Sequence, residues 1–350
     1  MESGAMHSDD VTVVICAYTY ERWNDICAAI KSIVQQELSV AEIIIVTDHN
    51  DPLAHGIRAF VRRIEPVVPV RVLANRGPRG LSGARNTGVA AARTEIVAFL
   101  DDDATADPSW VTRMVAGYDN PSVRGVGGYA RPRWPDGRRP GWFPVEFDWV
   151  VGCSYPGQPE CVAPVRNFIG ANMSLRRSDI RDIGGFHTGL GRVGTIPLGC
   201  EETELCIAIG RQRDDATLLF DPAMVVAHRV SDERIALRYF WRRCYAEGIS
   251  KAAVSGLVGS ADGLSSERVY TATVLPRGIA TRLRGLAVGS APRSLLAAQT
   301  AMIVSGVLVT TLGYVHGRIS GASVPPRQAN SLVRNDEVAP TPDDAARVAN

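Results

Sequence analysis

The sequence predicts an α/β protein in which helices cover both faces of a mostly parallel central sheet. Residues 96–100 form a short uninterrupted apolar run, typical of a strand buried on both faces of such a sheet, and further runs rich in β-branched residues predict strands at 11–18, 42–47 and 68–73. Between these runs, apolar residues recur every three or four positions, which indicates helices. Strands that alternate with helices favour a doubly wound sheet. A chain of 350 residues with 45% hydrophobic residues is long enough to build its core.

The elements are expected in the following order. Helical spacing covers residues 24–36 and 57–64, and small residues build a helix over 82–93. After the fourth strand we expect a helix over 110–118, a glycine-rich strand over 125–130, a strand entered at 167–174 and a helix over 177–183. A flexible, glycine-rich segment over 189–199 then leads to a helix from 201, a strand over 218–227 and a helix over 232–251.

Residues 131–149 predict a long irregular loop, because proline and glycine are dense there. Loops of this length in compact domains are often lids or binding loops. Its aromatic side chains suit three roles: stacking on a sugar ring, contact with a membrane surface, or packing that pins the loop to the core. These side chains belong to Trp134, Trp142, Phe143 and Trp149.

Composition narrows the class of partner. The net charge is +1, which gives no electrostatic reason to expect nucleic acid as a partner. The seven cysteines contain no C-x-x-C pair, so neither a zinc site nor a disulfide framework is indicated, and reduced thiols in the cytosol are expected. Residues 1–10 are polar and acidic, unlike a signal peptide, and are expected to be disordered.

Three consecutive carboxylates, Asp101, Asp102 and Asp103, follow directly on the apolar run 96–100. Ligands of open α/β sheets bind beyond the carboxyl ends of the strands. Three adjacent acids repel one another unless a cation lies among them, and hard divalent cations commonly arrive with substrate phosphates. The sequence therefore predicts a metal–phosphate site here. A dinucleotide-binding enzyme is disfavoured, because the turn at 17–22 contains no glycine.

An uncharged apolar segment covers residues 294–315, which is long enough to cross a bilayer. Its serine, threonine and glycine content leaves three possibilities open. The segment could span a membrane, lie on one, or pack against the globular domain. The tail at 320–350 is rich in proline, asparagine and aspartate, and is expected to be disordered.

The chain resembles glycosyltransferase family 2, the inverting nucleotide-sugar enzymes with the GT-A fold. The motifs occur in the family's order: the opening strand at 13–18, the second strand at 43–48, Gly83-Ala84-Arg85-Asn86-Thr87-Gly88, the acids 101–103 and the pair Glu201-Glu202. Within the family, the chain is similar to members that act on lipid-linked acceptors. It implies a GT-A domain at 11–250, with a nucleotide-binding half (11–130), an acceptor-binding half (131–250) and a helical C-terminal extension (251–319).

The resemblance implies donor-binding roles for six residues. The opening strand meets the nucleotide, the acid after the second strand reads the base, and the first acid of the triplet faces the ribose. These residues are Ala17, Tyr18, Asp48, Arg85, Asp101 and Asp102. An ion pair at the end of the sheet is the alternative role for Arg85, and a purely structural one is the alternative for Asp102.

The resemblance also implies a metal site and a catalytic base. Mg²⁺ or Mn²⁺ would be held by Asp103 and by His228, although a lone histidine is often structural. Glu202 occupies the position of the base. Residues expected near the acceptor, or accessory to it, are Glu201, Asn172, Trp142, Arg242 and Arg243. Capping of a helix N-terminus is the alternative for the acids, and a solvated helix face is the alternative for the two arginines.

Two positions depart from the family pattern. Residues 47–50 read Thr-Asp-His-Asn, which blurs the residue that reads the base, and Glu202 replaces the usual aspartate. The Gln-x-x-Arg-Trp signature of processive synthases is absent, so transfer of a single sugar is favoured over polymerisation.

The resemblance thus implies an inverting transferase that moves one sugar from a nucleotide-diphospho-sugar, with a UDP-sugar favoured, to an acceptor hydroxyl. It would act in polysaccharide, glycolipid or glycoprotein synthesis, in the cytoplasm or on the cytoplasmic face of the plasma membrane. One alternative is a synthase that transfers the sugar to a polyprenyl phosphate. The other is a nucleotide-sugar-binding protein without catalysis.

Overall fold

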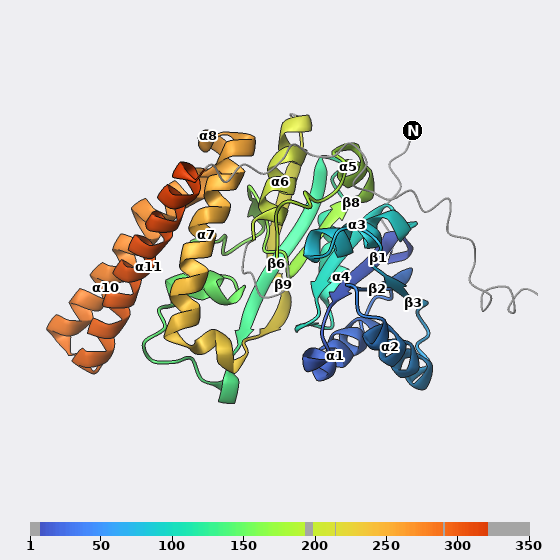
Figure 1. Cartoon of the computed structure of the whole chain (residues 1–350), viewed down its shortest axis with the longest axis horizontal. Helices are drawn as coiled ribbons and strands as arrows, with labels where there is room; N and C mark the ends of the chain where they lie inside the picture. Colours follow the sequence, from blue (N-terminus) through green and yellow to red (C-terminus); the bar gives the residue numbers. More distant parts are fainter. Residues whose placement is uncertain (1–7, 193–198, 214, 290, 321–350) are drawn as a thin grey trace, which may run out of the picture.

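A computed structural model of the chain describes residues 8–192, 199–213, 215–289 and 291–320. Within these residues nine strands form one sheet, which lies between helices on both faces (Figure 1). The strands follow the order β3-β2-β1-β4-β8-β6-β9-β5, and β7 pairs with β9. This arrangement confirms the predicted α/β class with helices on both faces of a central sheet.

The first half of the sheet is wholly parallel. β1 (Val11–Ala17) pairs with β2 (Glu42–Thr47) and β4 (Ile96–Asp101), and β2 pairs with β3 (Val70–Ala74). Successive residues of β1 point to opposite faces. Val13 packs in the core on one face of the sheet, whereas Val14 packs in the core on the other face. Two buried cores, one on each face, explain the uninterrupted apolar runs.

The second half of the sheet mixes strand directions. β8 (Asn172–Arg176) runs antiparallel to both β4 and β6 (Val123–Arg133), while β6 runs parallel to β9 (Thr217–Arg229). Two short strands, β5 (Ala104–Ala106) and β7 (Ala163–Pro164), pair antiparallel with β9. The register of β5 sets Ala104 opposite His228, which brings the triple acid beside that histidine.

Helices pack on the two faces of the sheet. The helices on one face are α1 (Trp23–Val34), α2 (Asp51–Ile64) and α4 (Trp110–Gly117), and those on the other are α3 (Leu81–Ala91), α5 (Arg177–Asp182) and α6 (Glu201–Gln212). Short 3-10 helices connect other segments: η1 (Ser8–Asp10), η2 (Tyr20–Arg22), η3 (Pro135–Gly137), η4 (Val145–Val151) and η5 (Asp232–Ile235). The expected irregular loop at 131–149 therefore contains some regular structure, since β6 extends to Arg133 and η3 and η4 lie within it or at its end.

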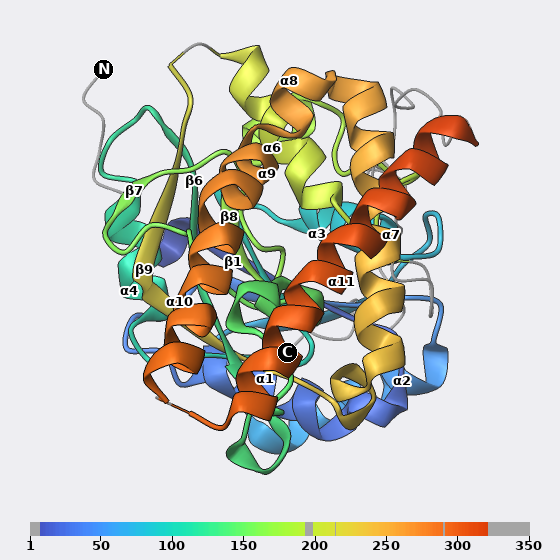
Figure 2. The ribbon, with the colours of Figure 1, turned by 90° about the vertical axis from the view of Figure 1, so that its left-hand side faces the viewer.

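A third layer is formed by the C-terminal helices. They are α7 (Leu237–Val258), α8 (Ser260–Gly263), α9 (Ser265–Val269), the π-helix η6 (Tyr270–Val274), α10 (Leu275–Val288) and α11 (Arg293–Ile319). Figure 2 shows α7, α11 and α10 lying across the front of the sheet. A separate aromatic core, which contains Phe143, Phe147, Phe240 and Ile303, joins this layer to the segment 142–151.

The expected apolar segment at 294–315 lies within α11, and its inner face belongs to this third core. Among the described helices, α11 is the one whose length and composition would suit a membrane span. Residues 8–10, expected to be disordered, form η1, whereas residues 1–7 and the tail at 321–350 lie outside the described residues. Most of the expected flexible approach, residues 193–198, also lies outside them.

Candidate active site

A cavity of about 1020 Å³ opens at the carboxyl ends of β1, β2 and β4 and extends to the C-terminal helices. The sheet supplies its floor, because these parallel strands end together. The predicted site residues that line it are Ala17, Tyr18, Asp48, Arg85, Asp101, Asp102, Asp103, Glu201, Glu202, His228 and Arg243. The fold thus brings together residues that lie more than two hundred positions apart in the chain.

The three acids differ in their surroundings. The Asp101 side chain is 30% exposed to the cavity, whereas Asp102 and Asp103 are buried. Arg22 donates to Asp102 Oδ1 at 2.5 Å and lies 3.1 Å from Asp103 Oδ2. Burial, opposed by Arg22 and reinforced by Asp103, raises the pKa of Asp102 to about 7. Asp102 Oδ2 has no hydrogen-bond partner among the described residues.

Asp103 is held by cations on several sides. Its Oδ1 lies 3.2 Å from His228 Nε2, and its Oδ2 lies 3.2 Å from Arg234 Nη2. Burial opposes ionisation, but His228, Arg22 and Arg234 together hold the pKa of Asp103 well below its usual value. Burial lowers the pKa of His228, but the negative charge of Asp103 outweighs this effect and raises that pKa to about 10.

The geometry of these side chains fits a divalent cation. Asp101, Asp103 and His228 each offer one ligand atom, and these atoms lie within 4.8 Å of one another. Carboxylate oxygens suit Mg²⁺ and Mn²⁺, and an added imidazole nitrogen suits a transition metal. The histidine is oriented for this role, because its Nε2 faces the acids while its Nδ1 lies 3.7 Å from Cys153 Sγ. The structure thus adds Asp101 to the predicted ligand pair.

Arg85 connects the two acidic motifs of the chain. Its Nη1 donates to Glu201 Oε1 at 2.9 Å, and its Nη2 donates to Gly170 O at 2.9 Å and lies 3.3 Å from Asp101 Oδ1. The Arg85 side chain is only 2% exposed, so the ion pair with Glu201 is fully buried. Both predicted roles of Arg85 remain compatible with this placement, since it ties the sheet end together and lines the cavity.

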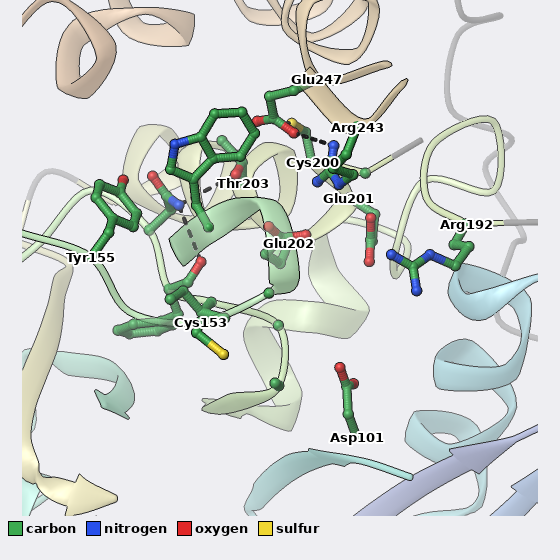
Figure 3. Close-up of a pocket in the computed structure, with 18 of the residues that line it drawn as sticks. Asp101, Cys153, Tyr155, Arg192, Cys200, Glu201, Glu202, Thr203, Arg243 and Glu247 are labelled. Atoms are coloured by element: carbon green, nitrogen blue, oxygen red, sulfur yellow. Dashed lines mark hydrogen bonds and ion pairs between the residues drawn. The ribbon is translucent and has the colours of Figure 1, made fainter. Parts of the chain in front are cut away.

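Glu202 projects into the cavity from the first turn of α6 (Figure 3). Cys200, the residue before α6, has φ 72° and ψ 13°, a left-handed conformation that is uncommon outside glycine, and it turns the chain sharply into the helix. Burial and the charge of Glu201 raise the pKa of Glu202 to about 8, although Arg85 opposes this. Because Arg85 already binds Glu201, Glu202 is the acid of the pair better suited to accept a proton.

The end of the cavity beside β2 is shaped around Asp48. Its carboxylate accepts from Asn75 Nδ2 at 2.7 Å and from the backbone N–H of Gly80 at 2.9 Å. The loop before α3 is thereby fixed against β2. Tyr18 is 40% exposed, and its ring lies 5.2 Å from the Arg22 guanidinium carbon.

The structure does not bring three of the predicted residues to the cavity lining. Asn172 is buried at the start of β8, where it donates to Met224 O at 2.8 Å and accepts from Trp110 Nε1 at 2.7 Å. Trp142 packs against Phe240, with ring centroids 5.9 Å apart. Arg242 lies on the exposed side of α7, while its neighbour Arg243 faces the cavity and donates to Glu247 Oε2 at 2.8 Å.

Among the arginines that the sequence analysis did not single out, Arg22, Arg192 and Arg234 also line the cavity. Arg192 is directed into the cavity in Figure 3 and forms no ion pair with any described residue. Burial, together with Arg234, Arg243 and Arg22, lowers its pKa. A cation kept among other cations is a suitable partner for a phosphate. No local motif marks these arginines: Arg22 and Arg234 lie in the 3-10 helices η2 and η5, and Arg192 lies outside the helices and strands.

Comparisons with known proteins point to one family. The family model described as "Glycosyl transferase family 2" matches residues 12–184. A "Glucosyl-dolichyl phosphate glucuronosyltransferase" of Haloferax volcanii is 30% identical over 89% of this chain and 96% of its own length. The succinoglycan biosynthesis protein ExoM of Rhizobium meliloti is 24% identical over 89% of this chain and 95% of its own.

Solved structures show the same fold at low sequence identity. The mannosyltransferase PcManGT from Pyrobaculum calidifontis, in complex with GDP-Man and Mn²⁺, aligns with a TM-score of 0.57 at 17% identity, over 87% of each chain. GalNAc-T7 with UDP, GalNAc and Mn²⁺ aligns with a TM-score of 0.50 at 16% identity, over 75% of this chain and 55% of its own.

The fold and its cavity thus define a glycosyltransferase of the GT-A class. Within that class, the chain belongs to glycosyltransferase family 2.

Proposed function

We propose that this enzyme transfers one sugar, with inversion, from a nucleotide-diphospho-sugar to an acceptor hydroxyl. The observation that carries the proposal is that a basic carboxylate, Glu202, faces the same cavity as the group Asp101, Asp103 and His228. Inverting transfer needs both features, one to accept the hydroxyl proton and one to hold the departing diphosphate.

Glu202 acts as the base. As the acceptor oxygen attacks the anomeric carbon, Glu202 takes the hydroxyl proton, and the bond between that carbon and the diphosphate oxygen breaks. Mg²⁺ or Mn²⁺, held by Asp103 and His228 with Asp101 beside them, would supply positive charge to the leaving diphosphate. Arg192 lies free of carboxylates among the described residues and adds a second positive charge for the same group.

The donor end of the cavity binds the nucleotide through the ends of β1 and β2. Ala17 and Tyr18 contact the nucleoside, Asp48 reads the base, and Asp101 and Asp102 support the ribose side. A UDP-sugar is favoured. In this division, residues 11–130 form the donor-binding half and 131–250 the acceptor-binding half, and the extension at 251–319 completes the acceptor side.

The acceptor is a lipid-linked sugar. The support is the Haloferax relative, whose printed name specifies a glucosyl-dolichyl phosphate acceptor and whose alignment covers nearly all of both chains. The enzyme would then work in cell-envelope glycan synthesis at the cytoplasmic face of the membrane. Transfer to a polyprenyl phosphate itself is the second candidate. It differs in its need for Glu202, because a phosphate acceptor needs no strong base.

Turnover with a panel of sugar nucleotides tests this proposal. UDP-, GDP- and dTDP-sugars would be incubated with Mn²⁺ and a glucosyl polyprenyl phosphate, and the anomeric configuration of the product read by NMR. We expect a UDP-sugar to give product of inverted configuration. Product of retained configuration would refute the mechanism, and binding of nucleotide sugars without any turnover would favour a non-catalytic role.

A further inference from the structure

An apolar stripe runs along the outward face of α11. It consists of Val304 (47% exposed), Leu308 (59%), Leu312 (62%), Val315 (45%) and Ile319 (80%). At 3.6 residues per turn these five positions share about a quarter of the helix circumference. Exposed apolar side chains aligned in this way mark a contact with a membrane or a partner.

The surroundings of this stripe are positively charged. Residues 268–320 contain six arginines and no aspartate or glutamate. Arg282 is buried in an ion pair with Glu146. The other five are exposed, and two of them, Arg293 and Arg318, stand at the two ends of α11. A stripe of apolar residues flanked by arginines is complementary to the surface of an anionic bilayer.

α11 is attached to the catalytic domain along its length. A Cβ at Gly313 would lie 2.1 Å from Tyr245 O, and a Cβ at Gly248 would lie 2.1 Å from Thr310 O, so α7 and α11 touch through their backbones. Alongside this contact α7 carries Arg243, Glu247 and Lys251. A spanning α11 would draw these charges into hydrocarbon, which is strongly unfavourable.

The cavity also reaches α11. Tyr270 and Val274 of η6 line it on one side, and Val307, Thr310 and Thr311 of α11 line it on the other. At 3.6 residues per turn, Val307 and Thr311 lie beside the stripe on the helix surface. The part of the cavity that η6 and α11 line therefore borders the stripe.

We propose that the stripe on α11 docks one leaflet of an anionic bilayer without crossing it, and that a lipid-linked acceptor passes from that leaflet into the cavity between η6 and α11. The first part stands on the exposed side chains and charges alone. The second rests on the proposed function, because it takes its ligand from that proposal.

Vesicle flotation tests the docking. The full-length protein would be floated with phosphatidylcholine vesicles that contain 30% phosphatidylglycerol and with pure phosphatidylcholine vesicles. We expect binding to the anionic vesicles, and a loss of at least tenfold in the double variant Leu308→Glu/Leu312→Glu. Val67→Glu is the matched control, because Val67 is 98% exposed on another part of the molecule and should leave binding unchanged.

Several outcomes would overturn the docking. These are equal flotation of the double variant, no flotation of the wild type with anionic vesicles, or wild-type protein that resists extraction by alkaline carbonate as a spanning protein does. Loss of a dimer in the double variant with unchanged flotation would assign the stripe to a second copy of the chain instead.

Turnover separates this inference from the proposed function. A glucosyl polyprenyl phosphate in vesicles and the same headgroup on a short water-soluble chain would be compared as acceptors. We expect the double variant to lose at least tenfold with the vesicle acceptor and less than twofold with the soluble one. Equal losses on both would refute access from the leaflet. A wild type inactive on both would refute the proposed acceptor, while flotation would still decide the docking.

Discussion

At the scale of single residues, Glu202 is a carboxylate that its surroundings keep basic. We expect Glu202→Gln to lower kcat by about 10²- to 10⁴-fold, because an amide cannot accept the hydroxyl proton. Nucleotide binding, measured by calorimetry, should be little changed. Glu202→Asp should keep part of the activity, and Glu233→Gln, an exposed acid outside the cavity lining, should keep all of it. Near-normal turnover in Glu202→Gln would remove Glu202 from the mechanism.

The raised pKa of Glu202 gives a pH dependence with a definite sign. Only the ionised form accepts a proton, so kcat/KM, which reports the free enzyme, should fall as the pH drops below the pKa of about 8. Below that value each pH unit should remove about a factor of ten. A rate profile measured between pH 6 and 9 tests this, and a flat profile would contradict it.

Arg85 is the residue whose loss should affect stability most. Arg85→Met would leave Glu201 as a buried carboxylate without its partner, which costs about 3–5 kcal/mol of unfolding free energy. The double variant Arg85→Met/Glu201→Gln should recover much of this stability, since no buried charge is then unpaired. Urea unfolding of both variants measures the difference. Equal destabilisation in the single and double variants would show that the ion pair is not the cause.

At the scale of helices and strands, the contact between α7 and α11 depends on glycine. Gly313→Ala would place a methyl group against the Tyr245 carbonyl and should lower the unfolding free energy by about 1–3 kcal/mol. Gly256→Ala is the matched control in α7, where a Cβ meets nothing within 4 Å. That substitution should raise stability by about 0.5–1 kcal/mol. Thermal unfolding compares the two, and equal melting temperatures would argue against close packing here.

The elements that the sequence predicts well are those with a strong local pattern. β1, β2 and β4 follow from apolar runs, and α1 and α2 from helical spacing. The three-residue β5 is too short to show any periodicity, yet it places His228 beside Asp103. The reversed direction of β8 was also unpredictable, because strand direction depends on the partner strand rather than on local sequence.

Side chains in the short 3-10 helices were the least predictable part of the candidate site. Arg22 and Arg234 pair with buried acids only because η2 and η5 fold back over the strand ends, and no spacing in the sequence signals this. Conversely, Asn172 stands in a distinctive segment, but its amide serves the sheet interior. A motif shows that a residue matters without showing which way its side chain faces.

At the scale of the whole molecule, cation and donor should act together on stability. Mn²⁺ with UDP should raise the melting temperature more than either alone, because a ligand that binds the folded state stabilises it by mass action. Excess EDTA should reduce transfer to background, and added Mn²⁺ or Mg²⁺ should restore it. Full activity in EDTA would show that Asp101, Asp103 and His228 hold no catalytic metal.

The packing of α11 bears on how this protein can be produced. Removal of an apolar terminal helix is a common route to soluble material when that helix is a detachable anchor. Here Met302 and Ile303 belong to the same buried cluster as Phe147 and Phe240. A chain shortened before Arg293 would uncover that cluster to water, and we expect it to aggregate. Detergent or vesicles added to the intact chain are therefore the better route to a workable preparation.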